Sequence, residues 1–92
     1  MDPTQFTLLI DTVFNYLESK VKPNGVLHKA LVLIQQYLDA NAATIAPTLP
    51  SSATDRQAFD AAMAWLESKS PWYLVGEEEL VQVAVDAYLT QH

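Results

Sequence analysis

The sequence predicts an all-α protein in which two helical hairpins pack together as a four-helix arrangement. Apolar residues recur at steps of three and four along four stretches of the chain, which is the spacing of an amphipathic helix. Breaks that contain proline separate these stretches. In addition, "DTVFNYLESK" at residues 11–20 returns as "DAAMAWLESK" at residues 60–69. This echo favours an internal duplication of one hairpin.

The composition predicts a single folded domain over residues 1–92. Half of the residues are hydrophobic and only 17% are charged, which is too apolar for a disordered chain. The chain has no cysteine, so it can form neither a disulfide nor a thiolate metal site. Its longest apolar run, "ALVLI" at residues 30–34, is far shorter than the roughly 20 residues of a membrane span. The acidic start "MDPTQFT" is unlike a secretory signal, so we expect a cytoplasmic protein.

The net charge of −6 is distributed unevenly along the chain. Residues 1–46 contain three lysines and four acidic residues, which gives −1. Residues 47–92 contain one arginine, one lysine and seven acidic residues, which gives −5. With so few basic side chains, the protein can neutralise only a few phosphate charges. We therefore expect neither nucleic acid nor an anionic membrane as a partner.

The first predicted helix covers about residues 4–22. Asp2 can cap it, Pro3 suits the first helical position, and Gln5 can complete a capping box. Its apolar stripe contains Phe6, Leu9, Ile10, Val13, Phe14, Leu17 and Val21. The turn signal "KPNG" ends it.

The second predicted helix covers about residues 26–45 and completes the first hairpin, at about residues 3–46. Its stripe contains Leu27, Ala30, Leu31, Ile34, Leu38, Ala42 and Ile45. Val32, Leu33 and Tyr37 widen this stripe, so we expect the helix to be covered on more than one side.

A proline-rich linker, "PTLPSSAT" at residues 47–54, leads to the second hairpin at about residues 55–91. The first helix of that hairpin covers about residues 55–70. Two pairs can form its capping box: Thr54 with Gln57, or Ser52 with Asp55. Its stripe contains Ala58, Phe59, Ala62, Met63 and Leu66. The many alanines would allow a neighbouring helix to approach closely.

The last segment follows "SPWYLVG" and has two interpretations. Three glutamates at residues 77–79 suit the first turn of a helix, where the helix dipole favours carboxylates. The alternation of Val81, Val83 and Val85 with other residues is instead the period of a strand. We favour the helix, because the acidic start is a helix signal and a lone strand would have no partner.

Within the echo, Leu17 and Leu66 are expected in the core, and the Glu-Ser-Lys tails in solvent. Further residues also match between the two halves: Tyr16 with Trp65, Val32 with Val83, and Tyr37-Leu38 with Tyr88-Leu89. Coincidence is the alternative explanation, because Leu, Glu and Lys are common helix formers.

Residues that carry chemistry are scarce. His28 and His92 are the only histidines, and neither has a second histidine at metal-ligand spacing. Two glycines cannot build a phosphate-binding loop, and the serines have no nucleophile-elbow context. We therefore predict no enzyme activity, no metal and no cofactor. A minimal enzyme would need Glu18 and Glu67 to converge in one cleft as an acid/base pair.

Two stretches are candidates for partner binding. "PWYLV" at residues 71–75 places two aromatic side chains in a connector, and Trp and Tyr are enriched at protein interfaces. The wide apolar surface of the second helix is the other candidate, and it also suits a homodimer. The predicted partner-binding residues are Trp72, Tyr73, Leu74, Val32, Leu33 and Tyr37. The alternative for the connector is that Trp72 and Leu74 close the core.

The stretch "DRQAFDAAMAWLESKSPWYLVGEEELVQVAVDAYL", residues 55–89, resembles the soluble C-terminal part of the LLH-type phage holins. In both, a helix leads through a short connector to a last helix that starts with "EEEL". The resemblance implies a phage or prophage source, with the protein in the host cytoplasm or associated with the virion. Such holins carry an N-terminal membrane span, whereas the first helix here contains Asp11, Asn15 and Glu18. A lysis function is therefore not carried over.

These observations predict a small helical protein–protein interaction module that acts in assembly, as an adaptor or in regulation. Its partner would be another protein or a second copy of the chain. The alternative is a small acidic inhibitor that blocks a host enzyme or regulator with its C-terminal half. Binding that weakens strongly with salt would favour the inhibitor.

Overall fold

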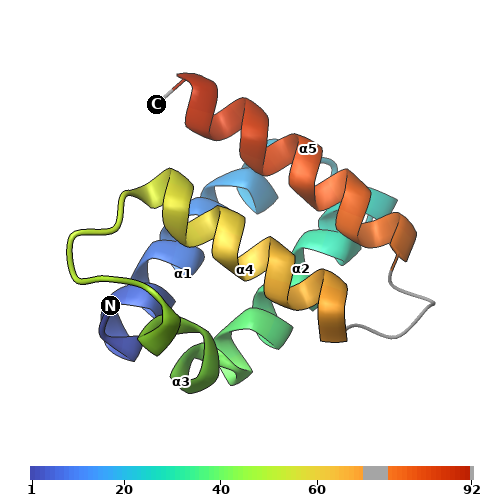
Figure 1. The fold of residues 1–92 in the computed structure, drawn as a ribbon. Coiled ribbons are helices and arrows are strands. Elements are labelled where there is room, and N and C mark those ends of the chain that lie inside the picture. The colour runs from blue at the N-terminus through green and yellow to red at the C-terminus, as the bar shows by residue number, and fades with distance from the viewer. Residues whose placement is uncertain (70–74, 92) are drawn as a thin grey trace.

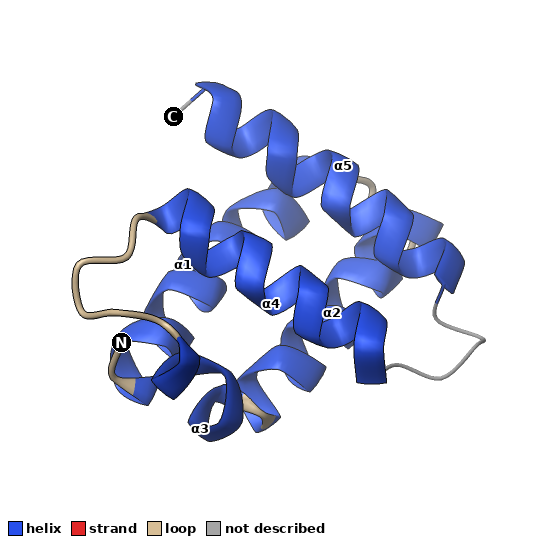
Figure 2. Ribbon diagram, viewed as in Figure 1, coloured by secondary structure: helices blue, strands red, loops and turns tan. Residues whose placement is uncertain are grey.

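The fold is all-α, as predicted, and Figure 1 shows its helices in a computed structural model. The structure describes residues 1–69 and 75–91, and this part of the chain contains no strand (Figure 2). The elements are α1 (Pro3–Lys20), α2 (Val26–Ala40), α3 (Ala42–Ile45), the 3-10 turn η1 (Ala46–Thr48), α4 (Asp55–Lys69) and α5 (Val75–Gln91). The last segment is thus a helix, and the strand alternative is wrong. No helix within the described ranges is both long and apolar enough to cross a membrane.

Local sequence signals set the starts of α1 and α4. The side chain of Asp2 accepts a hydrogen bond from the Thr4 amide at 2.6 Å, and Gln5 completes the capping box. At α4, the Gln57 amide donates to Thr54 Oγ1 at 3.1 Å, and the Thr54 amide donates to Gln57 Oε1 at 2.9 Å. Each box satisfies amide groups that would otherwise lack a partner in the first turn.

The prediction of four helices is corrected by the structure, because the expected helix over residues 26–45 breaks at Asn41. The backbone of Asn41 leaves the helical region, with φ −112° and ψ 15°. Its side-chain amide donates to the Tyr37 carbonyl at 2.8 Å. Asparagine readily forms such local bonds in place of the helix ladder. The chain therefore turns into the short α3, which buries Ala42 and Ile45 against the core.

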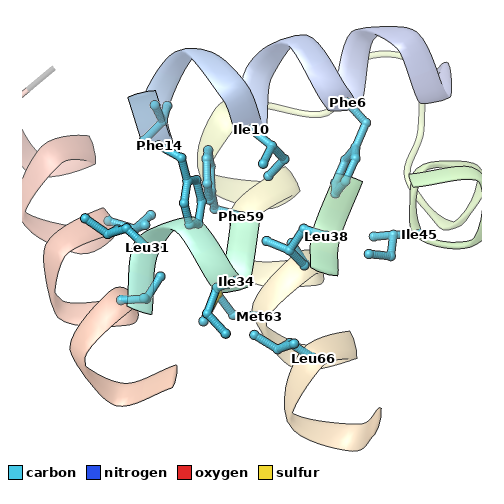
Figure 3. Packing of buried hydrophobic residues seen from close by; sticks show 14 of the residues in the cluster. Phe6, Ile10, Phe14, Leu31, Ile34, Leu38, Ile45, Phe59, Met63 and Leu66 are labelled. Atoms are coloured by element: carbon cyan, nitrogen blue, oxygen red, sulfur yellow. The ribbon is translucent and has the colours of Figure 1, made fainter. Parts of the chain in front are cut away.

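One hydrophobic core joins the helices. Figure 3 shows Phe6, Ile10 and Phe14 pointing from α1 toward residues of α2 and α4. The ring centroids of Phe14 and Phe59 lie 6.2 Å apart, which joins α1 to α4 at the centre. Around them, α1 packs on α2, α4 packs on α5, and α2 packs on α5. Side chains from all five helices thus share one buried interior.

Residues at matched positions of the echo make matched contacts. Tyr16 of α1 packs on Tyr88 of α5 with ring centroids 5.1 Å apart. Their counterparts, Trp65 of α4 and Tyr37 of α2, also pack together, at 5.8 Å. The tails match as well: Ser19 Oγ donates to the Tyr16 carbonyl and Ser68 Oγ to the Trp65 carbonyl, at 2.6 and 2.7 Å.

The match of the two leucines is incomplete. Leu66 is fully buried, whereas Leu17 is half-buried at the edge of the core. The prediction that both lie in the core is therefore only half correct.

Candidate interaction surface

The predicted partner-binding residues fall into two groups. Trp72, Tyr73 and Leu74 lie outside the residues that the structure describes, so their predicted role stays a prediction. Val32 and Leu33 lie on the outer side of α2. That side of α2 is the candidate surface.

Helix α2 buries one side and leaves another open. Ala30, Leu31, Ile34 and Leu38 form its buried side. Val26, Lys29 and Leu33 recur at steps of three and four on the open side. The side chain of Val26 is 73% exposed and that of Leu33 is 41% exposed. Two large apolar side chains therefore project from one helix face into solvent.

Leu33 and Lys29 separate two shallow depressions. The first, of about 180 Å³, lies toward α5 and is lined by Val26, Ala30 and Glu77 in addition to this pair. The second, of about 350 Å³, lies on the other side of the pair, and its remaining lining residues are Asn24, His28, Val32 and Gln36. The structure thus brings Val32 and Leu33 together in one hollowed surface.

Tyr37 does not belong to that surface. Its half-buried ring packs against Trp65 of α4 and against the core. Its placement suits a packing residue that holds α2 on α4.

Two further exposed apolar residues lie on α5 and were absent from the prediction. Leu80 is 44% exposed and Val83 is 70% exposed. Leu80 follows Glu77 by three residues, so the two are neighbours on the helix surface, and Glu77 itself lines the depression beside Val26. Helix α5 thus adds Glu77 to the lining of this depression and carries exposed apolar side chains of its own. The sequence signal that could have found these two residues is that α5 carries apolar residues on its outer face as well as on its inner face.

A separate polar cluster lies between α1 and α2. The side-chain amide of Gln35 donates to Asp11 Oδ1 at 2.8 Å and to Asn15 Oδ1 at 3.0 Å. Oδ1 of Asp39 and Oε2 of Glu18 are buried and receive no hydrogen bond from the described residues. The cluster thus combines one amide clamp with carboxyl oxygens that lack a donor.

Burial raises the pKa of Asp39 from 3.8 to about 7, and a hydrogen bond with Asp11 and the charge of Asp11 add to the rise. Burial also raises the pKa of Glu18; His28 opposes this rise and Asp11 adds to it. Within the described residues, no three carboxylates or histidines stand close enough together to hold a metal ion. Within the cluster, burial thus favours the protonated form of two carboxyl groups, Asp39 and Glu18.

Glu18 and Glu67 do not form the acid/base pair that a minimal enzyme would need. Glu18 is half-buried, and the charges that act on it belong to His28 and Asp11. Glu67 is exposed on α4.

Comparison with protein-family models, with curated proteins and with solved structures found no match to this chain. The resemblance of residues 55–89 to phage holins therefore stays a hypothesis from the sequence.

Proposed function

We propose that this chain is a protein–protein interaction module that docks a partner on the outer face of α2. The single observation that carries the proposal is the position of Leu33. This leucine stands exposed between two depressions whose linings include Val26, Val32 and Lys29. Interface centres commonly combine an apolar anchor with hollows that a partner's side chains can fill.

Leu33 would supply a moderate share of the binding free energy. Full burial of a leucine contributes about 1.5–3 kcal/mol. Because 41% of Leu33 is still exposed, covering it would add about 1 kcal/mol, or roughly fivefold in affinity. Leu80 and Val83 on the flank of α5 would extend the contact.

The matched contacts of the two halves support an origin by duplication. Each half supplies one residue to each of two corresponding aromatic pairs, Tyr16 with Tyr88 and Tyr37 with Trp65. In this proposal the duplicated hairpins form the core, and binding uses the outer surface of α2 next to α5.

A photo-crosslinking amino acid placed at position 33 tests the proposal. We expect a discrete crosslinked product with a host-cell lysate, or with a second copy of the chain. The matched control is position 8, because Leu8 is also an exposed leucine, on α1, and is 68% exposed. Equal crosslinking at both positions would contradict the proposal. The acidic-inhibitor alternative predicts that the product is lost as salt rises, whereas apolar docking predicts that it persists.

A further inference from the structure

The turn between α1 and α2, at residues 22–25, contains the only asparagine of the chain that precedes a glycine. The Gly25 amide donates a hydrogen bond to the Lys22 carbonyl at 3.0 Å, which closes the turn. Asn24 has a φ of 64°, in the left-handed region that asparagine tolerates better than most residues. Asn24 therefore lies at the tip of a tight surface turn.

The side chain of Asn24 is the least constrained of the three asparagine side chains. Asn24 is exposed, and within the described residues no hydrogen bond holds its side-chain amide. By contrast, Asn15 accepts a hydrogen bond from Gln35 at 3.0 Å, and the Asn41 side-chain amide donates to the Tyr37 carbonyl at 2.8 Å. The amide of Asn24 is thus free to rotate toward its own backbone.

The residue that follows an asparagine determines whether its side chain can react with the backbone. Asparagine is chemically labile, because the nitrogen of the following residue can attack the side-chain carbonyl carbon. The two groups are adjacent, so no other part of the chain has to approach. Gly25 carries no side chain to shield its nitrogen, whereas Tyr16 and Ala42 follow the other two asparagines. Position 24 therefore combines an amide that no bond holds with a backbone nitrogen that no side chain shields.

We propose that Asn24 is a site of spontaneous deamidation. The Gly25 nitrogen forms a bond to Cγ of Asn24, the bond from Cγ to the amide nitrogen breaks, and ammonia leaves with the proton of the Gly25 amide. Water then opens the cyclic imide at one of its two carbonyl carbons. One opening yields aspartate, and the other yields isoaspartate, in which the main chain runs through Cγ. Both products add one negative charge to the chain.

The fold restrains this reaction through two backbone hydrogen bonds of Gly25. Its amide donates to the Lys22 carbonyl, and its carbonyl accepts from the Lys29 amide, each at 3.0 Å. The attack removes the proton that the Gly25 amide donates, so the bond to Lys22 must open first. A surface turn at a helix end opens far more often than the core does. Asn24 therefore reacts in the folded chain, at a rate that opening of this turn limits.

Deamidation would change the charge beside the candidate surface. Asn24 lines the depression that also contains His28, Lys29 and Leu33, and none of the described residues that line it is acidic. A carboxylate at position 24 would add a negative charge to this lining and would attract Lys29. The modification itself does not depend on the proposed docking function, whereas any effect on a docked partner does.

Peptide mapping of the aged, unmodified chain tests the proposal, because trypsin separates the three asparagines. Cleavage after lysine and arginine, except before Pro23, yields the peptides 1–20, 21–29 and 30–56, each with one asparagine. We expect incubation at mildly alkaline pH to convert peptide 21–29 severalfold faster than the other two, into both aspartate and isoaspartate forms. An unincubated sample sets the starting point. Conversion of peptide 21–29 no faster than the others, or into aspartate alone, would overturn the proposal, since the cyclic imide yields both forms.

Two matched substitutions test the part of the Gly25 nitrogen. Gly25→Ala places a methyl group beside it, and the φ of −75° at this position suits alanine. The new Cβ would lie 3.1 Å from the Lys22 carbonyl oxygen, a tight contact that the exposed turn can relieve by a small shift. Gly76→Ala is the control, because Gly76 is exposed on α5 and an added Cβ there meets no atom within 4 Å.

We expect Gly25→Ala to slow the conversion of peptide 21–29 severalfold and Gly76→Ala to leave it unchanged. Circular dichroism checks that both variants keep the helical fold. Equal rates in the two variants would contradict attack by the Gly25 nitrogen.

Discussion

Raising the pH from about 5 to about 8.5 is expected to destabilise the folded chain through Asp39. The pKa of this carboxyl is 3.8 when the chain is unfolded and about 7 in the folded protein. Between these values the folded state binds the proton more tightly than the unfolded state does. Stability contributed by the proton is therefore fully present below about pH 4 and is lost as the pH rises through about 7.

The size of this effect follows from the same two values. Each pH unit of pKa difference corresponds to about 1.4 kcal/mol, so the full rise would correspond to about 4 kcal/mol. Asp39 is only partly buried, and solvent screens its interaction with Asp11. We therefore expect a loss of about 1–2 kcal/mol in the free energy of unfolding.

Urea unfolding followed by circular dichroism over this pH range measures that loss. Asp39→Asn removes the titrating group, so the variant should keep its stability where the unmodified chain loses it. Asp60→Asn is the control, since Asp60 is the exposed counterpart of Asp11 in the echo. Parallel stability curves for the unmodified chain and Asp39→Asn would refute the reasoning.

Three further substitutions test the packing and the caps, each by its free energy of unfolding in urea. Phe59→Ala removes a buried ring that packs beside Phe14, so we expect this substitution to lower the free energy of unfolding by about 3–5 kcal/mol. A loss under about 1 kcal/mol would contradict the described core. Asp2→Ala removes the N-cap of α1 and should lower the free energy of unfolding by about 1 kcal/mol. Asp2→Asn is the control, because asparagine also caps helices and should keep most of that stability. Arg56→Ala breaks an exposed ion pair with Asp86 and should cost less than about 1 kcal/mol, and a larger cost would show that this pair is a major support of the fold.

The sequence predicted the long helices because their determinants are local. The capping boxes at Asp2 and Thr54 and the apolar stripes needed no knowledge of the fold. The break at Asn41 was missed, because the stripe continues through Ala42 and Ile45, and whether the chain turns there depends on the surface that those residues find. Tertiary packing decides such cases over local propensity.

The candidate surface was predicted in part for the same reason. Val32 and Leu33 stood out as apolar residues beyond a normal stripe, and the structure places both in the hollowed face of α2. Tyr37 showed the same signal, but it packs on Trp65. The sequence did not show this packing, because a pattern along one helix does not reveal which neighbouring helix covers a side chain. The raised pKa of Asp39 was missed, since its main cause is burial between packed helices, which a polar position in a helical pattern does not reveal.

The most direct test of the docking proposal is the affinity of a partner, identified by crosslinking at position 33, for two matched variants. Leu33→Glu places a charge at the centre of the proposed contact, and Leu8→Glu places the same charge on an equally apolar, exposed site of α1. We expect Leu33→Glu to weaken binding by at least about tenfold and Leu8→Glu to change it by less than about twofold. Both variants should unfold at the same urea concentration as the unmodified chain to within experimental error. Unchanged affinity of Leu33→Glu, or an equal loss in Leu8→Glu, would contradict docking on α2.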